Sequence, residues 1–155
     1  MPSSTLKSFL DSRGASYDSI THAPAIAAQD VALVSHVEQR DFAKTLIVKI
    51  KGELTMVVLP ADRKIVLADL RDLLGTGDVR FATEAEFQDR FPDCEVGAMP
   101  PFGNLYGLPV YVSRELADEP EIAFNAGTHR EVIKMPYSEF ASMVRPNVVD
   151  IGVVD

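Results

Sequence analysis

A lysine stands at the entrance of the most apolar strand that the sequence predicts. Lys44 follows Phe42 and Ala43 and comes directly before the apolar, β-branched run of residues 45–50. An ammonium group held there could lie beside a phosphate or a polarised carbonyl. A lysine at the start of a strand is also commonly solvated, with its aliphatic stem along apolar neighbours. Lys44 is therefore a candidate site residue, but alone it does not identify a site.

A second candidate is the loop rich in glycine and proline at residues 97–103. It begins with Gly97 and ends with Pro100-Pro101-Phe102-Gly103. Proline fixes φ and lacks a backbone donor, whereas glycine permits unusual dihedral angles and close approach to a ligand. The segment is either a rigid surface turn or a preformed loop that presents backbone amides and carbonyls to a ligand.

The third candidate is the segment 124–129, where a predicted strand runs into a polar turn. It contains Asn125, Gly127 and His129. Histidine is versatile in catalysis, although a lone histidine is more often structural or merely exposed than catalytic. None of the three segments is specific alone, and only their combination points to a site.

Several familiar kinds of site are absent from the sequence. It contains no Gly-x-Gly-x-x-Gly or Walker-type phosphate loop, no His-Glu-x-x-His and no Gly-x-Ser-x-Gly nucleophile elbow. The three histidines are scattered and Cys94 is the single cysteine, which excludes an internal disulfide and a site with several thiolates. We therefore expect no metal and no cofactor.

The chain is acidic, with 15 Lys and Arg against 23 Asp and Glu and a formal net charge of -8. Proteins that hold the nucleic-acid backbone without sequence preference use many cationic contacts, so general DNA binding is disfavoured. Any nucleic-acid partner should meet the protein at one small site. No signal peptide or membrane span is visible in the sequence, and we expect a cytoplasmic protein.

Apolar spacing predicts the elements that position these candidates. The strongest signal is a hairpin whose strands, residues 45–50 and 54–59, are near-continuous apolar runs, a pattern typical of strands buried on both faces. A capping-box pattern from Thr83 to Glu86 begins a helix that should run to about Phe91. The other predicted helices span residues 5–12, 26–37, 66–74 and 137–144, and the other strands span 17–21, 110–112, 121–124 and 131–135.

These elements mix without a regular βαβ rhythm, a linker or a repeat. The 155 residues fit one domain, which we take to span residues 1–155. We predict an α/β (α+β) fold with a mixed, curled, barrel-like β-sheet and helices packed outside it.

Together, the three segments resemble the YbaK family, also known as the prolyl-tRNA synthetase-associated editing domain. The resemblance extends from about Leu6 to Pro146. A turn at residues 21–24 is similar to a His-Pro-Pro turn of the family, with Ala23 in place of the first proline, and its expected role is steric. The resemblance rests on Lys44-Thr45-Leu46, on Gly97-x-x-Pro100-Pro101-Phe102-Gly103 and on Phe124-Asn125-Ala126-Gly127-x-His129.

The resemblance implies an aminoacyl-tRNA deacylase, which hydrolyses the ester between a wrong amino acid and the terminal adenosine of a tRNA. Members of this family act on tRNA(Pro) that carries alanine or cysteine, because both side chains fit a proline pocket. A synthetase rejects smaller side chains poorly by binding alone, since a missing methylene is worth only about 1–3 kcal/mol. The implied partners are the 3' end of aminoacyl-tRNA and, transiently, prolyl-tRNA synthetase.

The resemblance also implies roles for individual residues. Lys44 would hold the terminal nucleotide, and Gly97 with the loop backbone through Pro101 would orient the aminoacyl carbonyl as fixed dipoles. His129 would position substrate or water. Water or a ribose hydroxyl would attack, because no side chain is a convincing nucleophile or general base. We expect Lys44, Gly97 and His129 to act in catalysis, and the substrate-binding set to be His22, Thr45, Pro100, Pro101, Phe102, Gly103, Asn125 and Gly127.

Two other interpretations stay open. The chain could be a binding module that recognises the tRNA acceptor end without hydrolysis, or a structural or regulatory domain with a vestigial pocket. Retention of Lys44, Gly97 and His129 favours activity. Alanine is the first expectation for the amino acid and cysteine the second, with serine and threonine also open. Candidate side chains for the amino-acid pocket are Ile47, Val58, Met99 and Phe102.

Overall fold

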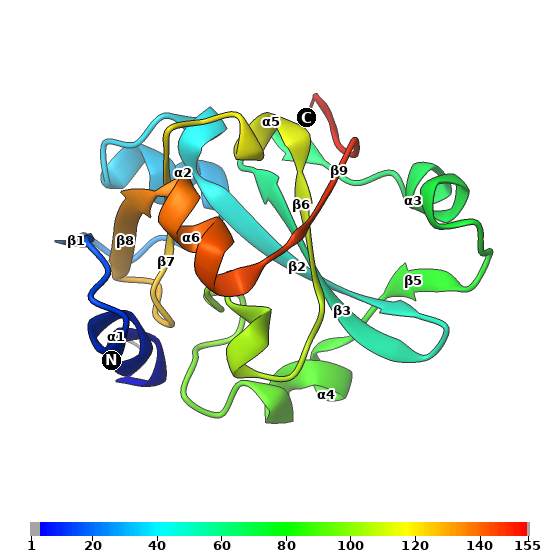
Figure 1. Cartoon of the computed structure of the whole chain (residues 1–155), viewed down its shortest axis with the longest axis horizontal. Helices are drawn as coiled ribbons and strands as arrows, with labels where there is room; N and C mark the ends of the chain where they lie inside the picture. Colours follow the sequence, from blue (N-terminus) through cyan, green and yellow to red (C-terminus); the bar gives the residue numbers. More distant parts are fainter. Residues whose placement is uncertain (1–3, 155) are drawn as a thin grey trace.

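The larger of the two main sheets is built around the predicted hairpin. The computed structural model describes residues 4–154, and in it β2 (Ala43–Ile50) and β3 (Glu53–Pro60) pair antiparallel over their whole length. β5 (Val79–Phe81) lies antiparallel beside β2, whereas β6 (Val110–Ser113) and β9 (Asn147–Val149) add parallel strands beyond β3. The strand order is β5-β2-β3-β6-β9, and the hairpin crosses the centre of Figure 1.

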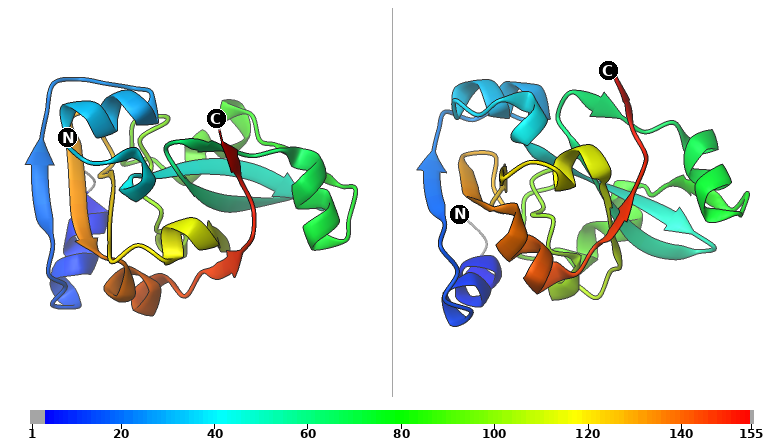
Figure 2. Two further views of the ribbon diagram at one scale, coloured as in Figure 1. Left: turned by 90° about the horizontal axis from the view of Figure 1, so that it is seen from above. Right: turned by 45° about the horizontal axis from the view of Figure 1, so that its top comes forward.

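A smaller antiparallel sheet carries the segment with Asn125 and His129. Its strands are β1 (Asp18–Thr21), β8 (Glu131–Pro136) and β7 (Glu121–Asn125), in the order β1-β8-β7. A parallel bridge between Phe42 and Ala123 joins the two sheets. Figure 2 shows the smaller sheet at the end of the molecule away from the β2–β3 turn. A further short pair joins β4 (Arg63–Lys64) to β10 (Val153–Val154).

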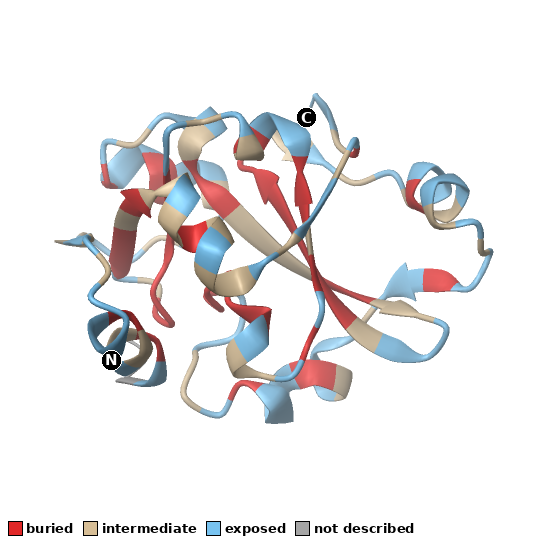
Figure 3. Cartoon of the chain, in the orientation of Figure 1, coloured by how far each residue is buried: buried red, intermediate tan, exposed pale blue. Residues whose placement is uncertain are grey.

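Apolar side chains cover both faces of the larger sheet, as the continuous apolar runs predict. Alternate residues of a strand point to opposite faces. Ile47 and Val58 accordingly lie in the main core, whereas Val48 and Val57 lie in a second cluster on the other face. Figure 3 shows the buried residues along β2, β3 and β6. This burial supplies the main stabilisation, at about 25 cal/mol for each Å² of apolar surface removed from water.

Helices pack outside the sheets. The α-helices are α1 (Ser4–Ser12), α2 (Ala28–Val34), α3 (Leu67–Leu74), α4 (Glu84–Phe87), α5 (Arg114–Ala117) and α6 (Tyr137–Val144), and the 3-10 turns are η1 (Gln39–Asp41), η2 (Gln88–Arg90) and η3 (Gly103–Leu105). α1 and α6 contribute to the main core, α3 covers the opposite face of the larger sheet, and α2 covers a third cluster around Phe42. None of the helices among residues 4–154 is long and apolar enough to cross a lipid bilayer.

The predicted fold class is confirmed, with two differences in detail. The strands among residues 4–154 form separate sheets and not a closed barrel. The predicted helices 26–37 and 83–91 are shorter: α2 is followed by His36 in the left-handed region, at φ 58°, and α4 passes into the 3-10 turn η2. Apart from these differences, five short elements of two to four residues each were not predicted: α5, β4, β5, β9 and β10.

The predicted capping box is present at α4 and connects this helix to the sheet. The Glu86 carboxylate accepts hydrogen bonds from the Thr83 backbone N–H at 2.9 Å, from Arg80 Nη2 at 2.6 Å and from Lys49 Nζ at 2.8 Å. These contacts, that of Arg80 first, hold the pKa of Glu86 far below its ordinary value. One carboxylate thus joins α4 to β5 and β2.

Gly103 lies where the structure has no room for a side chain. A Cβ added there would lie 2.6 Å from Val110 Cγ2 and 2.7 Å from the backbone oxygen of Leu108. We predict that Gly103→Ala lowers the free energy of unfolding by about 1–3 kcal/mol through overpacking, as measured by urea denaturation. The control is Gly77→Ala, because a Cβ at Gly77 meets nothing within 4 Å. Equal losses in the two variants would contradict the prediction.

Candidate functional site

The candidate site centres on the tip of the β7–β8 hairpin, residues 126–130. The tip follows Asn125, the last residue of β7, and precedes Glu131, the first residue of β8. Its base is closed by a hydrogen bond from Ala126 N–H to the Glu131 carbonyl at 3.0 Å. Gly127 and His129 both lie in this hairpin tip, so the third predicted segment is held by the smaller sheet.

The glycine-proline loop closes directly on the hairpin tip. The Glu95 N–H donates to the Gly127 carbonyl at 2.7 Å, and the Gly127 N–H donates to the Ala98 carbonyl at 3.0 Å. The His129 N–H donates to Glu95 Oε1 at 2.8 Å, and His129 Nε2 lies 2.9 Å from the Val96 carbonyl. The second and third predicted segments therefore form one unit. Sequence reasoning did not find Glu95 and Val96, because no motif marks them.

Gly97 has a backbone conformation that favours glycine. Its φ is +86°, a conformation that residues with a Cβ rarely adopt. A Cβ there would lie 3.5 Å from Cε1 of His129, an ordinary van der Waals distance. The preference for glycine therefore comes from the φ angle, and the distance shows that Gly97 lies next to the imidazole of His129.

The turn at residues 22–25 lies against the same hairpin tip. The His22 N–H donates to the Arg130 carbonyl at 2.8 Å, and the Ala25 N–H donates to the His129 carbonyl at 3.2 Å. His22 follows the last residue of β1, which pairs with the start of β8. Hence His22, Asn125 and His129 all come from the same end of the smaller sheet.

Lys44 reaches this region through the bridge between the two sheets. Phe42 and Ala123 are paired in parallel, so Lys44 and Asn125 lie two residues beyond the bridge on their respective strands. Because side chains alternate along a strand, Lys44 and Asn125 occupy equivalent positions. Lys44 is half-buried there. Thr45, predicted to bind substrate, alternates to the other face of β2.

Four of the predicted substrate-binding residues form the buried end of the loop. Pro100, Pro101, Phe102 and Gly103 are all buried. The Phe102 ring packs against two other aromatic rings of the core, with centroids 5.4 and 5.3 Å away. The structure places these residues as supports of the loop. The suggested pocket residues Ile47, Val58, Met99 and Phe102 likewise belong to the main core.

Three side-chain atoms of the predicted site are buried and have no hydrogen-bond partner among residues 4–154. They are His22 Nε2, Asn125 Oδ1 and His129 Nδ1. A carbonyl only accepts hydrogen bonds, so His129 Nε2 must donate to the Val96 carbonyl, and Nδ1 of the neutral ring is left as an acceptor. In His22 the nitrogens are reversed, because Nδ1 lies 2.6 Å from the Ala23 carbonyl. All three atoms are therefore hydrogen-bond acceptors.

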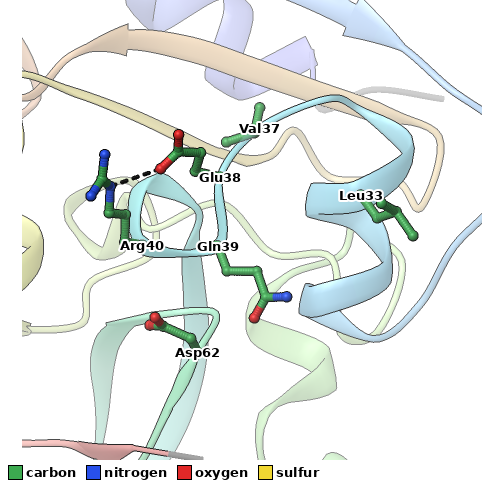
Figure 4. Close-up of a pocket in the computed structure, with 6 residues that line it drawn as sticks. All are labelled: Leu33, Val37, Glu38, Gln39, Arg40 and Asp62. Carbon is green, nitrogen blue, oxygen red and sulfur yellow. Dashed lines mark ion pairs between the residues drawn. The ribbon is translucent and has the colours of Figure 1, made fainter.

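A surface hollow of about 440 Å³ lies beside the entrance of β2, between α2 and η1. In Figure 4, Leu33 lies on α2 at one side, and Arg40 pairs with Glu38 at the other. The side chain of Leu33 is 73% exposed, so the rim is partly apolar. The hollow is lined by Leu33, Val37, Glu38, Gln39, Arg40 and Asp62, none of which was predicted as a site residue.

Two carboxyl groups interact near the same entrance. Asp41, the last residue of η1, shares a hydrogen bond with Glu119, and this contact is the main reason why the pKa of Glu119 is raised. Desolvation and the negative charge of Asp41 act in the same direction. Within residues 4–154, no group of three or more His, Cys, Asp or Glu side chains could hold a metal ion.

A family model described as the aminoacyl-tRNA editing domain matches residues 22–143, a span that contains every predicted site residue. The chain belongs to the aminoacyl-tRNA editing domain family. The predicted resemblance is thereby confirmed.

One protein of similar sequence and two solved structures of similar fold resemble this editing domain. The chain is 27% identical over 150 residues to the "Multifunctional Ser/Thr-tRNA deacylase ProXp-y" of Escherichia coli (strain K12), covering 94% of this chain and 89% of that protein. The fold matches the "Crystal structure of hypothetical protein APE2540" with a TM-score of 0.84 at 21% identity, covering 96% and 99% of the two chains. It also matches the "Crystal structure of a putative trans-editing enzyme for prolyl tRNA synthetase" with a TM-score of 0.82 at 20% identity, covering 96% and 95%.

The geometry predicts opposite tautomers for the two site histidines of the editing domain. In its neutral form, His129 should carry its proton on Nε2, which faces the Val96 carbonyl, and His22 on Nδ1, which faces the Ala23 carbonyl. Long-range ¹⁵N–¹H spectra of the imidazole rings measure this directly. The exposed His36 is the internal reference. The same tautomer in His22 and His129 would contradict the described contacts.

Proposed function

We propose that this chain is a trans-editing aminoacyl-tRNA deacylase, which hydrolyses the ester of mischarged tRNA. The observation that carries the proposal is the contact of His129 with Glu95 and Val96, the two residues directly before the glycine-proline loop, in a chain whose editing-family match spans both segments. Lys44 approaches the same hairpin through the bridge between the sheets. Hydrolysis of an ester by positioning and electrostatics requires groups that are held in fixed places around it. Here these groups are a cation, a fixed loop and an oriented imidazole.

In this proposal each group has a separate task. Lys44 places its positive charge beside a phosphate or the ester oxygen of the terminal nucleotide, where it balances negative charge that develops on the oxygen. The backbone from Gly97 to Pro101 fixes the aminoacyl carbonyl, and the burial of residues 98–101 keeps those dipoles aimed. His129 positions the substrate, and water or a ribose hydroxyl is the nucleophile. The partner is the 3' end of aminoacyl-tRNA, with prolyl-tRNA synthetase as a transient partner.

Two sets of amino acids are candidates for the ester that is cleaved. Alanine and cysteine on tRNA(Pro) follow from the resemblance to the prolyl editing domains. One structure of similar fold is named as a putative trans-editing enzyme for prolyl tRNA synthetase. Serine and threonine are favoured by the name of the Escherichia coli relative, which matches over most of both chains. All four are small, so a compact site suits either set.

Removal of the lysine tests the mechanism. We predict that Lys44→Ala lowers kcat/KM for deacylation by about 100-fold or more, the size of effect expected when one preorganised electrostatic group is lost. Lys44→Arg should retain part of the activity, because it keeps the charge. The assay follows loss of labelled amino acid from tRNA. The control is Lys64→Ala, at an exposed position of β4. Wild-type rates in Lys44→Ala would remove the lysine from the mechanism.

A panel of substrates separates the two sets of amino acids from a module that only binds tRNA. We predict faster ester loss than in buffer alone for at least one of Ala-tRNA(Pro), Cys-tRNA(Pro), seryl-tRNA and threonyl-tRNA, and protection of the correct prolyl-tRNA(Pro). Because one methylene is worth about 10–200-fold in discrimination, substrates that differ by one such group should differ in kcat/KM within about that range. Binding of all tRNAs without ester loss would favour the binding module.

A further inference from the structure

Three buried hydrogen-bond acceptors without a partner are unusual in so small a region. Most buried polar atoms in folded proteins are hydrogen-bonded, and a buried acceptor left unpaired costs about 1–3 kcal/mol. His22 Nε2, Asn125 Oδ1 and His129 Nδ1 lack partners among the described residues. Asn125 is only 7% exposed as a whole residue. A ligand that donates hydrogen bonds to these atoms would recover the lost interactions.

The strand register brings the three residues to one place. His22 follows β1, Asn125 ends β7, and His129 lies in the hairpin tip that leads into β8. The three strands are adjacent in the order β1-β8-β7. Backbone hydrogen bonds hold residue 22 against Arg130 and residue 25 against His129. The backbone therefore brings His22, Asn125 and His129 to the same end of the smaller sheet.

We propose that His22, Asn125 and His129 form an acceptor set that binds the free α-amino group of the aminoacyl ester. This proposal rests on the proposed deacylase function and defines the substrate further. An amino group offers two N–H donors when neutral and three when protonated, whereas a hydroxyl group offers one. A set of several acceptors is thus better matched by an amine than by a ribose or side-chain hydroxyl.

The charges around the set suit an amine. Imidazole and carboxamide acceptors are neutral, so they do not require a full positive charge on the ligand. A protonated amine can donate to all three acceptors, and a neutral amine can donate to two of them. The acceptor set recognises a feature shared by all aminoacyl-tRNAs, so the choice among amino acids must come from the groups around the side chain.

Entry to the set requires a small movement at the turn formed by residues 22–25. The three acceptor atoms are buried, and the described backbone hydrogen bonds from this turn to the hairpin tip are those of His22 and Ala25. Ile26, just beyond the turn, is 74% exposed, so it adds little packing that would resist a shift. The ordered strands beneath the turn keep the acceptors in place.

Acylation of the α-amino group is the first test. N-acetylation removes donors from the nitrogen and adds bulk. We expect it to lower kcat/KM by about 100-fold or more, because each lost hydrogen bond is worth roughly 10-fold. The assay compares N-acetylseryl-tRNA with seryl-tRNA and N-acetylalanyl-tRNA with alanyl-tRNA. Each enzymatic rate is divided by the rate of spontaneous hydrolysis of the same ester, which corrects for chemical reactivity. Equal corrected rates would overturn the proposal.

The second test removes one acceptor, Asn125 Oδ1. If this atom serves binding, its removal should lower activity and leave the stability of the fold intact. Asn125→Leu should lower kcat/KM about 10-fold for substrates with a free amine and leave the rate for N-acetylated substrates within about threefold. Its free energy of unfolding should stay equal or rise, because an unpaired buried polar atom is replaced by an apolar group of similar shape. The matched control is Asn104→Leu, at an exposed position in η3. Equal losses on both substrate types in Asn125→Leu would indicate a structural role and overturn the proposal.

A binding experiment separates failure of this proposal from failure of the proposed function. The probes are stable amide analogues, 3'-seryl- and 3'-alanylamino-3'-deoxyadenosine, with and without an N-acetyl group. We expect the imidazole ¹⁵N signals of His22 and His129 to shift only with the free amines. Shifts with both forms would overturn the acceptor set and leave the deacylase function intact. No binding of any probe, together with no ester loss, would contradict both.

Discussion

The hydrogen bond between His129 Nε2 and the Val96 carbonyl, at 2.9 Å, is the contact on which the arrangement of the site depends. It joins two segments that are 33 residues apart in the chain and fixes both the orientation and the tautomer of the imidazole. Gly97 lies next to this ring, and its φ of +86° is a backbone conformation that favours glycine. The conformation of the loop and the orientation of the histidine therefore depend on each other.

The main core holds the loop that makes this contact. Phe102 lies among aromatic rings of the core, and Gly103 leaves no space for a Cβ beside Val110. The motif that suggested ligand binding thus contains two kinds of residue. Gly97 lies at the surface against the imidazole, whereas Phe102 and Gly103 hold the loop to the core. Rigid support of this kind is what catalysis by positioning requires, because a small displacement of a fixed dipole removes much of its effect.

The sequence predicted the long elements and the site segments, but not how the segments meet. The apolar runs of β2 and β3 have enough residues to show a pattern, and the capping box at Thr83 is a local signal. β4 and β10 have two residues each and exist because they pair with each other across the chain, so no local pattern could reveal them. The meeting of the loop with His129 is equally long-range. By contrast, the alternation of side chains along a strand is enough to predict that Lys44 and Thr45 lie on opposite faces of β2.

The acidity of the chain also constrains how it meets tRNA. With a net charge of -8, long-range attraction to a polyanion is weak or absent, so recognition has to come from short-range contacts at the acceptor end. Lys44 supplies a local cation, while unpaired acceptors at His22, Asn125 and His129 supply sites for donors. In the proposed function, such a site would bind the aminoacylated end and gain little from the rest of the tRNA. Binding mainly through the aminoacylated end suits an enzyme that must release the tRNA once the ester is cleaved. Cleavage separates the amino acid from the tRNA, so the groups that hold the amino acid no longer hold the tRNA.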